Sequence, residues 1–248
     1  MTTLQVLMPM GGLGTRFRKV GVTTPKPLIE VGGVPMFQRA LASLAPWAGE
    51  KTVTVVVRED NDREYDLARR VVEAEPSADI VLLEHDTRGA VETCLTARDR
   101  LDPDQPLVIM DCDIAFDSPE YFRVLQQAVE AAALDGLLLS FHSTQPRYSF
   151  AEVGADGLVV RTAEKQAIST DALMGVYSFT SARVFLDAAD RLMARQIDAA
   201  MPEYYVSLVF NELIAAGRPV GLVRGDFYCF GTPEELADFE RTGLPVGA

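Results

Sequence analysis

The stretch LQVLMPMGGLGTRF, residues 4–17, indicates the class of fold because it joins an apolar run directly to a loop rich in glycine. The run at 4–10 is apolar at nearly every position, which is typical of a strand covered on both faces of a parallel sheet. In open α/β sheets, ligands bind outside the carboxyl ends of the strands, where such a loop lies. The stretch therefore predicts an α/β protein with a ligand site at its first loop.

Similar apolar runs alternate with amphipathic segments along the rest of the chain. This βαβα alternation predicts a Rossmann-like sheet, mixed but mostly parallel, that is flanked by helices on both faces. We expect strands at 4–10, 51–59, 79–85, 106–113, 135–143, 173–179 and 219–228. We expect helices at about 35–46, 61–75, 89–101, 119–133, 181–195, 204–216 and 231–243.

The chain reads as one α/β domain. Its 248 residues and hydrophobic content of 48% fit a single unit that spans 1–248. The segment at about 145–172 breaks the alternation with short strand-like pieces and turns, and it predicts an insertion beside the sheet that carries substrate contacts. The last helix has clear signals at both ends, because Thr232 is an N-cap residue, Glu235 completes a capping box and Gly243 stops the helix.

The charge and the N-terminus exclude several classes of partner. The formal net charge is −13, with 36 acidic and 23 basic residues, so the chain repels nucleic acids and anionic membranes. No apolar stretch approaches the length of a membrane span, and the N-terminus lacks the features of a signal peptide. We therefore expect a cytoplasmic protein that binds neither nucleic acid nor membrane.

The cysteines and histidines suggest neither disulfides nor nucleophilic catalysis. Three cysteines, Cys94, Cys112 and Cys229, form no CxxC pair, and an odd number argues against a disulfide framework. We expect reduced and mostly buried thiols. The two histidines, His85 and His142, belong to no evident Ser-His-Asp or Cys-His arrangement, so we expect structural or surface positions for both.

The glycine loop departs from the two commonest phosphate-binding motifs. It is not a Walker A loop, because no Lys-Ser/Thr follows the glycines, and Phe17 stands where GxGxxG would have its third glycine. Its glycines still allow a phosphate chain to approach the backbone, and Arg16 and Lys26 supply cations. Pro25 and Pro27 restrict the backbone around Lys26. The loop therefore predicts a phosphate site of a different type.

GGLGTRF (11–17) followed by PKPLIEVGGVPM (25–36) resembles the signature of the sugar nucleotidyltransferases, also called nucleoside-diphosphate-sugar pyrophosphorylases. Further pieces follow in the order of that family: TRGAVET (87–93), VIMDCD (108–113), AEKQAIS (163–169), LMGVYSF (173–179) and FGTPEEL (230–236). The resemblance covers nearly the whole catalytic domain. It implies a Mg²⁺-dependent reaction in which a sugar 1-phosphate, or a similar phosphorylated small molecule, attacks the α-phosphate of an NTP and pyrophosphate leaves. Such chemistry needs positioning and charge neutralisation rather than a protein nucleophile.

The resemblance also assigns roles to residues of this chain. The residues that it implies for catalysis are Arg16, Lys26 and Asp113, of which Asp113 also binds Mg²⁺. Those that it implies for the nucleotide are Met10, Gly11, Gly12, Gly14, Thr15, Gly89, Glu92 and Asp111. Those that it implies for the acceptor are Glu164, Lys165, Gly175 and Tyr177. Only four lysines occur in the chain, and two of them fall on these expected phosphate contacts.

The metal site departs from the family at one position. Asp111 and Asp113 are two residues apart in an expected strand, so they point to one face, where either contacts the metal or both merely cap the strand end. The family often has a second metal-binding aspartate in a W-x-D-x-G-T context, but this chain reads GDFYCFGT and has Cys229 there. A neutral thiol is a poor ligand for Mg²⁺. Either Asp226 replaces the missing carboxylate in a reshaped loop, or the metal relies on Asp113, phosphate oxygens and water.

Two other functions stay open. A glycosyltransferase of related α/β type would use Asp111-Cys112-Asp113 as a DxD metal motif, and Cys229 suits a non-catalytic nucleotide-binding regulatory protein. GTRF and PKPL favour the nucleotidyltransferase, because a glycosyltransferase receives a finished nucleotide sugar and needs no pyrophosphate site. The sequence leaves open the NTP, the acceptor (sugar phosphate, cyclitol phosphate, phosphocholine-like or phosphonate) and whether the chain forms a homo-oligomer.

Overall fold

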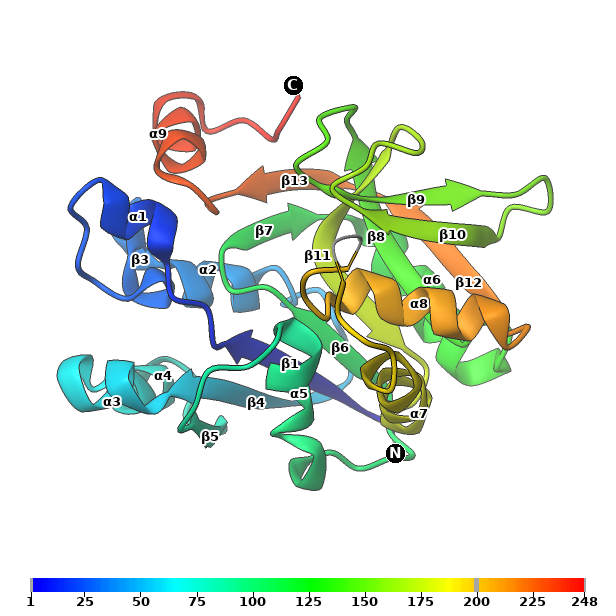
Figure 1. Cartoon of the computed structure of the whole chain (residues 1–248), viewed down its shortest axis with the longest axis horizontal. Coiled ribbons are helices and arrows are strands. Elements are labelled where there is room, and N and C mark those ends of the chain that lie inside the picture. Colours follow the sequence, from blue (N-terminus) through cyan, green and yellow to red (C-terminus); the bar gives the residue numbers. More distant parts are fainter. Residues whose placement is uncertain (1, 199–200, 248) are drawn as a thin grey trace.

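A computed structural model describes residues 2–198 and 201–247, and a mixed nine-stranded sheet forms its centre (Figure 1). The sheet follows the order β10-β9-β11-β6-β1-β4-β5, and β8 lies beside β11 with β12 beyond it. Its strands are β1 (Thr3–Met10), β4 (Glu50–Arg58), β5 (Asp79–Leu83), β6 (Leu107–Met110), β8 (Gly136–His142), β9 (Ser149–Val153), β10 (Val159–Glu164), β11 (Asp171–Phe179) and β12 (Val220–Arg224).

The sheet is mostly parallel, as the apolar runs predicted. Strands β1, β4, β5, β6, β8, β9 and β12 run in one direction, while β10 and β11 run in the other. Residues 4–8 of β1 are all buried, so this strand is covered on both faces. The expected single α/β domain with helices on both sides of the sheet is therefore confirmed.

The helices lie on both faces of the sheet, and each face packs against its helices through its own apolar cluster. One cluster joins alternate residues of β1, such as Val6, to α2, α4 and α6. The other joins Leu7 and Val56 to α5, α7 and α8. The helices are α1 (Thr15–Lys19), α2 (Met36–Ala42), α3 (Glu59–Tyr65), α4 (Leu67–Ala74), α5 (Ala90–Leu95), α6 (Pro119–Ala131), α7 (Ala182–Met193), α8 (Val206–Ala215) and α9 (Pro233–Thr242), with short 3-10 turns at Lys26–Leu28 and Arg98–Arg100.

Three expected elements are divided. The helix predicted at 89–101 becomes α5 and the 3-10 turn Arg98–Arg100. The helix predicted at 61–75 breaks between α3 and α4 at Asp66, whose φ of 52° is left-handed. The strand predicted at 219–228 breaks at Gly225. This position has no room for a side chain, because a Cβ there would lie 2.6 Å from the Cβ of Ser118. Beyond Gly225, β13 (Asp226–Cys229) leaves the main sheet and pairs with β7 (Ile114–Asp117). A further small hairpin, β2 (Glu30–Val31) with β3 (Val34–Pro35), follows the PKPL segment.

Strand β11 changes partners halfway along its length. Its first residues pair with β9, and residues from Val176 onward pair with β6. The change occurs around Gly175, whose φ is 82°. The irregular segment at 145–172 thus contributes a β9–β10 hairpin that continues the sheet past the end of β6. In Figure 1 this hairpin and α9 lie along the same upper side of the molecule, with β13 between them.

The cysteines and histidines of the described part of the chain lie as expected. Cys94, Cys112 and Cys229 are free and buried. His85 and His142 are exposed. Across residues 2–198 and 201–247, the helices are all too short or too polar to cross a membrane.

Candidate active site

A charged pocket of about 160 Å³ lies beyond the carboxyl ends of β1 and β6, beside Gly175 of β11. The place is typical of ligand sites in α/β folds. The pocket brings together six residues that the sequence singled out, Arg16, Asp111, Asp113, Glu164, Gly175 and Tyr177. They come from four separate segments of the chain, so the fold supports one site rather than scattered surface groups.

Lys26 and Asp113 form an ion pair at the edge of this pocket. The Lys26 Nζ donates a hydrogen bond to Asp113 Oδ2, and only 24% and 18% of the two side chains are exposed. Burial by itself would lower the pKa of Lys26, but the neighbouring Asp113 carboxylate, helped by Asp111, raises it above its ordinary value. Lys26 therefore keeps its positive charge where an incoming phosphate would meet Asp113.

Asp111 lies behind Asp113 and packs against Gly175. Strand β6 ends at Met110, so both aspartates belong to the turn after the strand. The Asp111 N–H donates to the Gly175 carbonyl at 2.9 Å, and a Cβ on Gly175 would collide with Asp111 Oδ2. Burial, together with repulsion from Asp113, raises the pKa of Asp111 to about 7. Glycine at position 175 is thus required by both its positive φ and the approach of this carboxylate.

The expected acceptor residues Glu164, Gly175 and Tyr177 line the pocket, whereas Lys165 does not. Glu164 Oε2 accepts hydrogen bonds from the hydroxyls of Ser149 and Ser207, and burial raises the pKa of Glu164 despite these bonds. Lys165 has a left-handed φ of 54°. Its Nζ donates to the Tyr205 hydroxyl at 2.8 Å and lies 4.8 Å from that ring's centroid. Among described residues, Glu164 lines the pocket whereas Lys165 is turned to Tyr205.

The glycine loop, residues 11–14, joins the end of β1 to the start of α1. Met10 is the buried last residue of β1, and Thr15 is the exposed first residue of α1. Gly14 has a left-handed φ of 61°, and a Cβ on Gly11 would lie 3.0 Å from Thr93 Oγ1, whereas Gly12 faces open space. Close approach or backbone conformation therefore explains two of the three glycines.

A second loop, residues 87–89, precedes α5, the helix whose Thr93 lies beside Gly11. Gly89 has φ 139°, and a Cβ there would lie 2.6 Å from the backbone nitrogen of Tyr204. Glu92 binds the Arg88 guanidinium at 2.7 Å, and this hydrogen bond lowers the pKa of Glu92. Glu92 thus holds the loop through Arg88, with its carboxylate already engaged in this structure.

Asp226 does not join Asp113 in the pocket. Side chains alternate between the two faces of a strand, and in β13 Phe227 and Cys229 line the pocket while Asp226 is exposed on the other face. The idea that Asp226 replaces the missing carboxylate is therefore not supported by this arrangement. Burial raises the pKa of the Cys229 thiol well above its ordinary value, so this residue is neutral.

The pocket also contains residues that the sequence did not predict as site residues, among them Arg147, Tyr148 and Glu235. Arg147 and Tyr148 belong to the segment that the sequence marked only as a whole. Thr232 Oγ1 caps α9 by accepting from the Glu235 N–H at 3.2 Å. The Glu235 carboxylate, however, binds Arg147 across the pocket at 2.9 Å instead of completing the capping box. The FGTPEEL motif predicted that Glu235 lies in the first turn of α9, but it did not predict the ion pair with Arg147.

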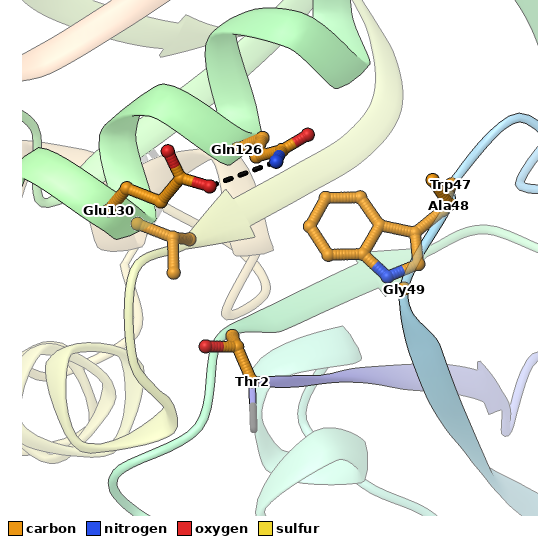
Figure 2. Close-up of a pocket in the computed structure, with 7 residues that line it drawn as sticks. Thr2, Trp47, Ala48, Gly49, Gln126 and Glu130 are labelled. Atoms are coloured by element: carbon orange, nitrogen blue, oxygen red, sulfur yellow. Dashed lines mark hydrogen bonds between the residues drawn. The ribbon is translucent and has the colours of Figure 1, made fainter.

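A second pocket lies at the other end of the sheet, near the amino ends of β1 and β4. Figure 2 shows the Trp47 indole opposite α6, where Gln126 Nε2 donates to Glu130 Oε1 at 2.9 Å, with Thr2 beside them. No lysine or arginine is among the described residues that line it. It therefore lacks the fixed cations that a triphosphate needs, and the pocket at Asp113 is the candidate active site.

Comparison with known proteins places the chain among nucleotidyltransferase-like sequences and folds. A family model for the MobA-like NTP transferase domain matches residues 6–204. The chain is 25% identical over 181 residues to the mannose-1-phosphate guanylyltransferase catalytic subunit beta of Drosophila pseudoobscura pseudoobscura, covering 71% of this chain and 47% of that protein. It is 29% identical over 118 residues to the mannose-1-phosphate guanyltransferase of Schizosaccharomyces pombe, covering 47% of this chain and 32% of that protein.

The matches thus span less than half the length of these two curated relatives. Among solved structures, the nucleoside-diphosphate-sugar pyrophosphorylase from Vibrio cholerae RC9 superposes with a TM-score of 0.81 and 26% identity, covering 96% of this chain and 100% of that one. The likeness therefore extends over the whole fold.

Proposed function

We propose, from the premise that this chain belongs to the MobA-like NTP transferase domain family, that it is a sugar-phosphate nucleotidyltransferase. An oxygen of a phosphorylated small-molecule acceptor attacks the α-phosphate of an NTP, and pyrophosphate leaves. The observation that carries the proposal is the ion pair of Lys26 and Asp113, which lies at the pocket between the glycine loop and Glu164. A phosphate oxygen is already anionic, so the protein has only to position and neutralise the reacting groups.

The residues of the pocket divide this work. The backbone of Gly11, Gly12 and Gly14 approaches the nucleotide phosphates, and the arginine at 16 offsets the charge of the leaving pyrophosphate. Lys26 neutralises the reacting phosphates, since its ammonium already faces Asp113.

The acceptor is held on the opposite wall. Glu164, kept in place by Ser149 and Ser207, binds acceptor hydroxyls. Lys165 leaves the Tyr205 hydroxyl to meet the acceptor phosphate, and Gly175 and Tyr177 shape the wall.

Mg²⁺ is the cofactor that the reaction class implies, and the residues present fit it. No cluster of three or more His, Cys, Asp or Glu side chains arranged for a metal occurs within residues 2–198 and 201–247. Mg²⁺ does not need one, since it is commonly held by one or two carboxylates together with substrate phosphates and water. Asp113 would hold the ion, with Asp111 next to it, and bound Mg²⁺ would supply neutralisation of phosphate charge.

The composition supports a proposal for the setting of the reaction. We place the enzyme in the cytoplasm, which the three free thiols support, because a reducing compartment keeps cysteines unpaired. Its partners are the NTP and the acceptor, and the net charge of −13 disfavours nucleic acid and anionic membranes.

The test is pyrophosphate release with each of the four NTPs, Mg²⁺ and a panel of mannose 1-phosphate, glucose 1-phosphate, myo-inositol 1-phosphate and phosphocholine. We expect release with at least one pair, in an amount equal to the nucleotide conjugate formed. Transfer from a finished nucleotide sugar without pyrophosphate release would instead identify a DxD glycosyltransferase. Binding of NTP without any turnover would identify a regulatory nucleotide-binding protein.

A further inference from the structure

Arg58 ties together the segments that follow three neighbouring strands of the sheet. It is the last residue of β4, which lies between β1 and β5. Its Nη1 donates to Asp86 Oδ1 at 2.7 Å, in the loop after β5, and to the Gly11 carbonyl at 3.4 Å, in the glycine loop after β1. Its Nε and Nη2 each donate to an oxygen of Asp60 at 3.0 Å. Only 13% of the Arg58 side chain is exposed.

The two carboxylates fix the position of the guanidinium. Asp60 is itself held, because its Oδ1 accepts from the Asn61 N–H at 2.7 Å. A planar guanidinium that is bound along one edge by a carboxylate presents its remaining N–H groups in fixed directions. Arg58 is not among the described residues that line the pocket at Asp113. Its contact with the site therefore runs through the Gly11 carbonyl.

The hydrogen bond to the Gly11 carbonyl also sets the direction of the next N–H group. The peptide bond between Gly11 and Gly12 is trans, and in a trans unit the carbonyl and the following N–H point to opposite sides. With the Gly11 carbonyl on Arg58, the Gly12 N–H points away from Arg58. Gly12 is exposed, and its N–H donates to no backbone carbonyl within residues 2–198 and 201–247. It is a donor that an anion in the loop can use.

A peptide unit between two glycines needs such a restraint. Glycine lacks the Cβ that limits backbone rotation, so this unit can rotate more easily than one between larger residues. Rotation would exchange the two groups and present the Gly11 carbonyl oxygen, with its partial negative charge, where the Gly12 N–H had been. An oxygen there repels a phosphate, whereas an N–H attracts it. The hydrogen bond from Arg58 opposes this rotation.

We propose that Arg58 is a positioning residue for the nucleotide, which holds the Gly11 carbonyl so that the Gly12 N–H is directed to the phosphates of the NTP. This inference rests on the proposed function, because it takes the glycine loop as the nucleotide site. Arg58 acts through the peptide unit and touches neither substrate. Its loss therefore weakens binding of the NTP and leaves binding of the acceptor unchanged.

The test measures the KM for NTP and the KM for acceptor separately, by pyrophosphate release with the pair that the wild type uses best. For Arg58→Ala we expect the KM for NTP to rise at least about tenfold, as when a hydrogen bond from a charged group is lost, and the KM for acceptor to change less than about twofold. Arg58→Lys keeps the charge but replaces the planar set of donors by one ammonium, so it should restore only part of the loss. Arg63→Ala is the matched control, because Arg63 of α3 forms an ion pair with Glu59 at 2.9 Å but is 73% exposed.

Asp86→Ala separates the effect of position from that of charge. This substitution removes a negative charge near the glycine loop, so charge alone would lower the KM for NTP. It also removes one anchor of the Arg58 guanidinium, which the inference predicts will raise that KM by about twofold or more.

Several results would overturn the inference and leave the proposed function intact. These are an unchanged KM for NTP in folded Arg58→Ala, an equal rise in both KM values, full restoration by Arg58→Lys, the same effect from Arg63→Ala, or a lower KM for NTP in Asp86→Ala. If circular dichroism shows that Arg58→Ala is unfolded, Arg58→Lys and Asp86→Ala decide, and an unchanged KM for NTP in both overturns the inference.

A wild type that turns over no NTP would refute the proposed function, and calorimetric titration with Mg²⁺ and each of the four NTPs would then decide the inference. Affinity that falls at least about tenfold in Arg58→Ala and is kept in Arg63→Ala would support it. Equal affinity in the wild type and Arg58→Ala, or no binding by the wild type, would refute it.

Discussion

Gly89→Ala should destabilise the protein strongly through the loop on the nucleotide side. With φ 139°, residue 89 occupies backbone space that is nearly exclusive to glycine, which costs an alanine about 1–3 kcal/mol. An added Cβ would also lie 2.6 and 2.7 Å from the nitrogen and oxygen of Tyr204. Tyr204 cannot retreat freely, because its N–H donates to the Arg88 carbonyl at 2.9 Å and its carbonyl accepts from the Val91 N–H at 3.0 Å.

Loss of those two backbone hydrogen bonds adds about 1–3 kcal/mol, so the expected total is about 2–6 kcal/mol of unfolding free energy. Urea unfolding followed by circular dichroism measures it. Gly12→Ala is the matched control for stability, since a Cβ there meets open space and the substitution should leave the free energy within about 1 kcal/mol of the wild type. A Gly89→Ala protein as stable as the Gly12→Ala protein would refute the reasoning.

Two further predictions concern a buried carboxyl and a helix cap. Burial raises the pKa of Glu164, so between the ordinary value of 4.5 and the raised one the folded state keeps a proton that the unfolded chain has lost. The contribution of Glu164 to the free energy of unfolding is therefore present below about pH 4.5 and declines as the pH rises through the raised pKa. Urea unfolding between about pH 5 and pH 8 should show a smaller decline of this free energy for Glu164→Gln than for the wild type. An identical pH profile for the two proteins would contradict this assignment. Ser118→Ala should cost about 1–2 kcal/mol, because the Ser118 hydroxyl accepts from the Tyr121 N–H at 3.3 Å as the N-cap of α6 and donates to the Arg224 carbonyl at 2.9 Å. The same unfolding assay checks it, with Ser181→Ala, which removes the cap of α7, expected to cost less; a larger loss from Ser181→Ala would be the contrary result.

Local patterns were sufficient to predict most of the elements. The apolar runs at 4–10 and 173–179 became strands within a residue or two, because full burial on both faces leaves a clear signal in sequence. Helix α9 begins after its N-cap residue Thr232 and ends at Gly243, whose φ of 64° is left-handed. These features depend on neighbours in the chain, which a sequence displays directly.

Features that depend on distant residues could not be read in this way. The lack of room for a side chain at Gly225 depends on Ser118, which is more than a hundred residues away in the chain. The pairing of Arg147 with Glu235 likewise needs the hairpin and α9 to meet, although both residues were visible in segments that the sequence marked. The side chains of β13 alternate between its two faces, which places Asp226 outside the pocket, and this orientation depends on the pairing of β13 with β7 rather than with the main sheet.

The central claim is that the pocket at Lys26 and Asp113 catalyses nucleotidyl transfer. The most direct measurement is the rate of pyrophosphate release by Lys26→Ala, with Lys51→Ala as the control, because Lys51 is exposed at the start of β4. The account predicts that Lys26→Ala loses at least about a hundredfold in rate while Lys51→Ala keeps the wild-type rate. A folded Lys26→Ala protein that releases pyrophosphate as fast as the wild type would contradict it.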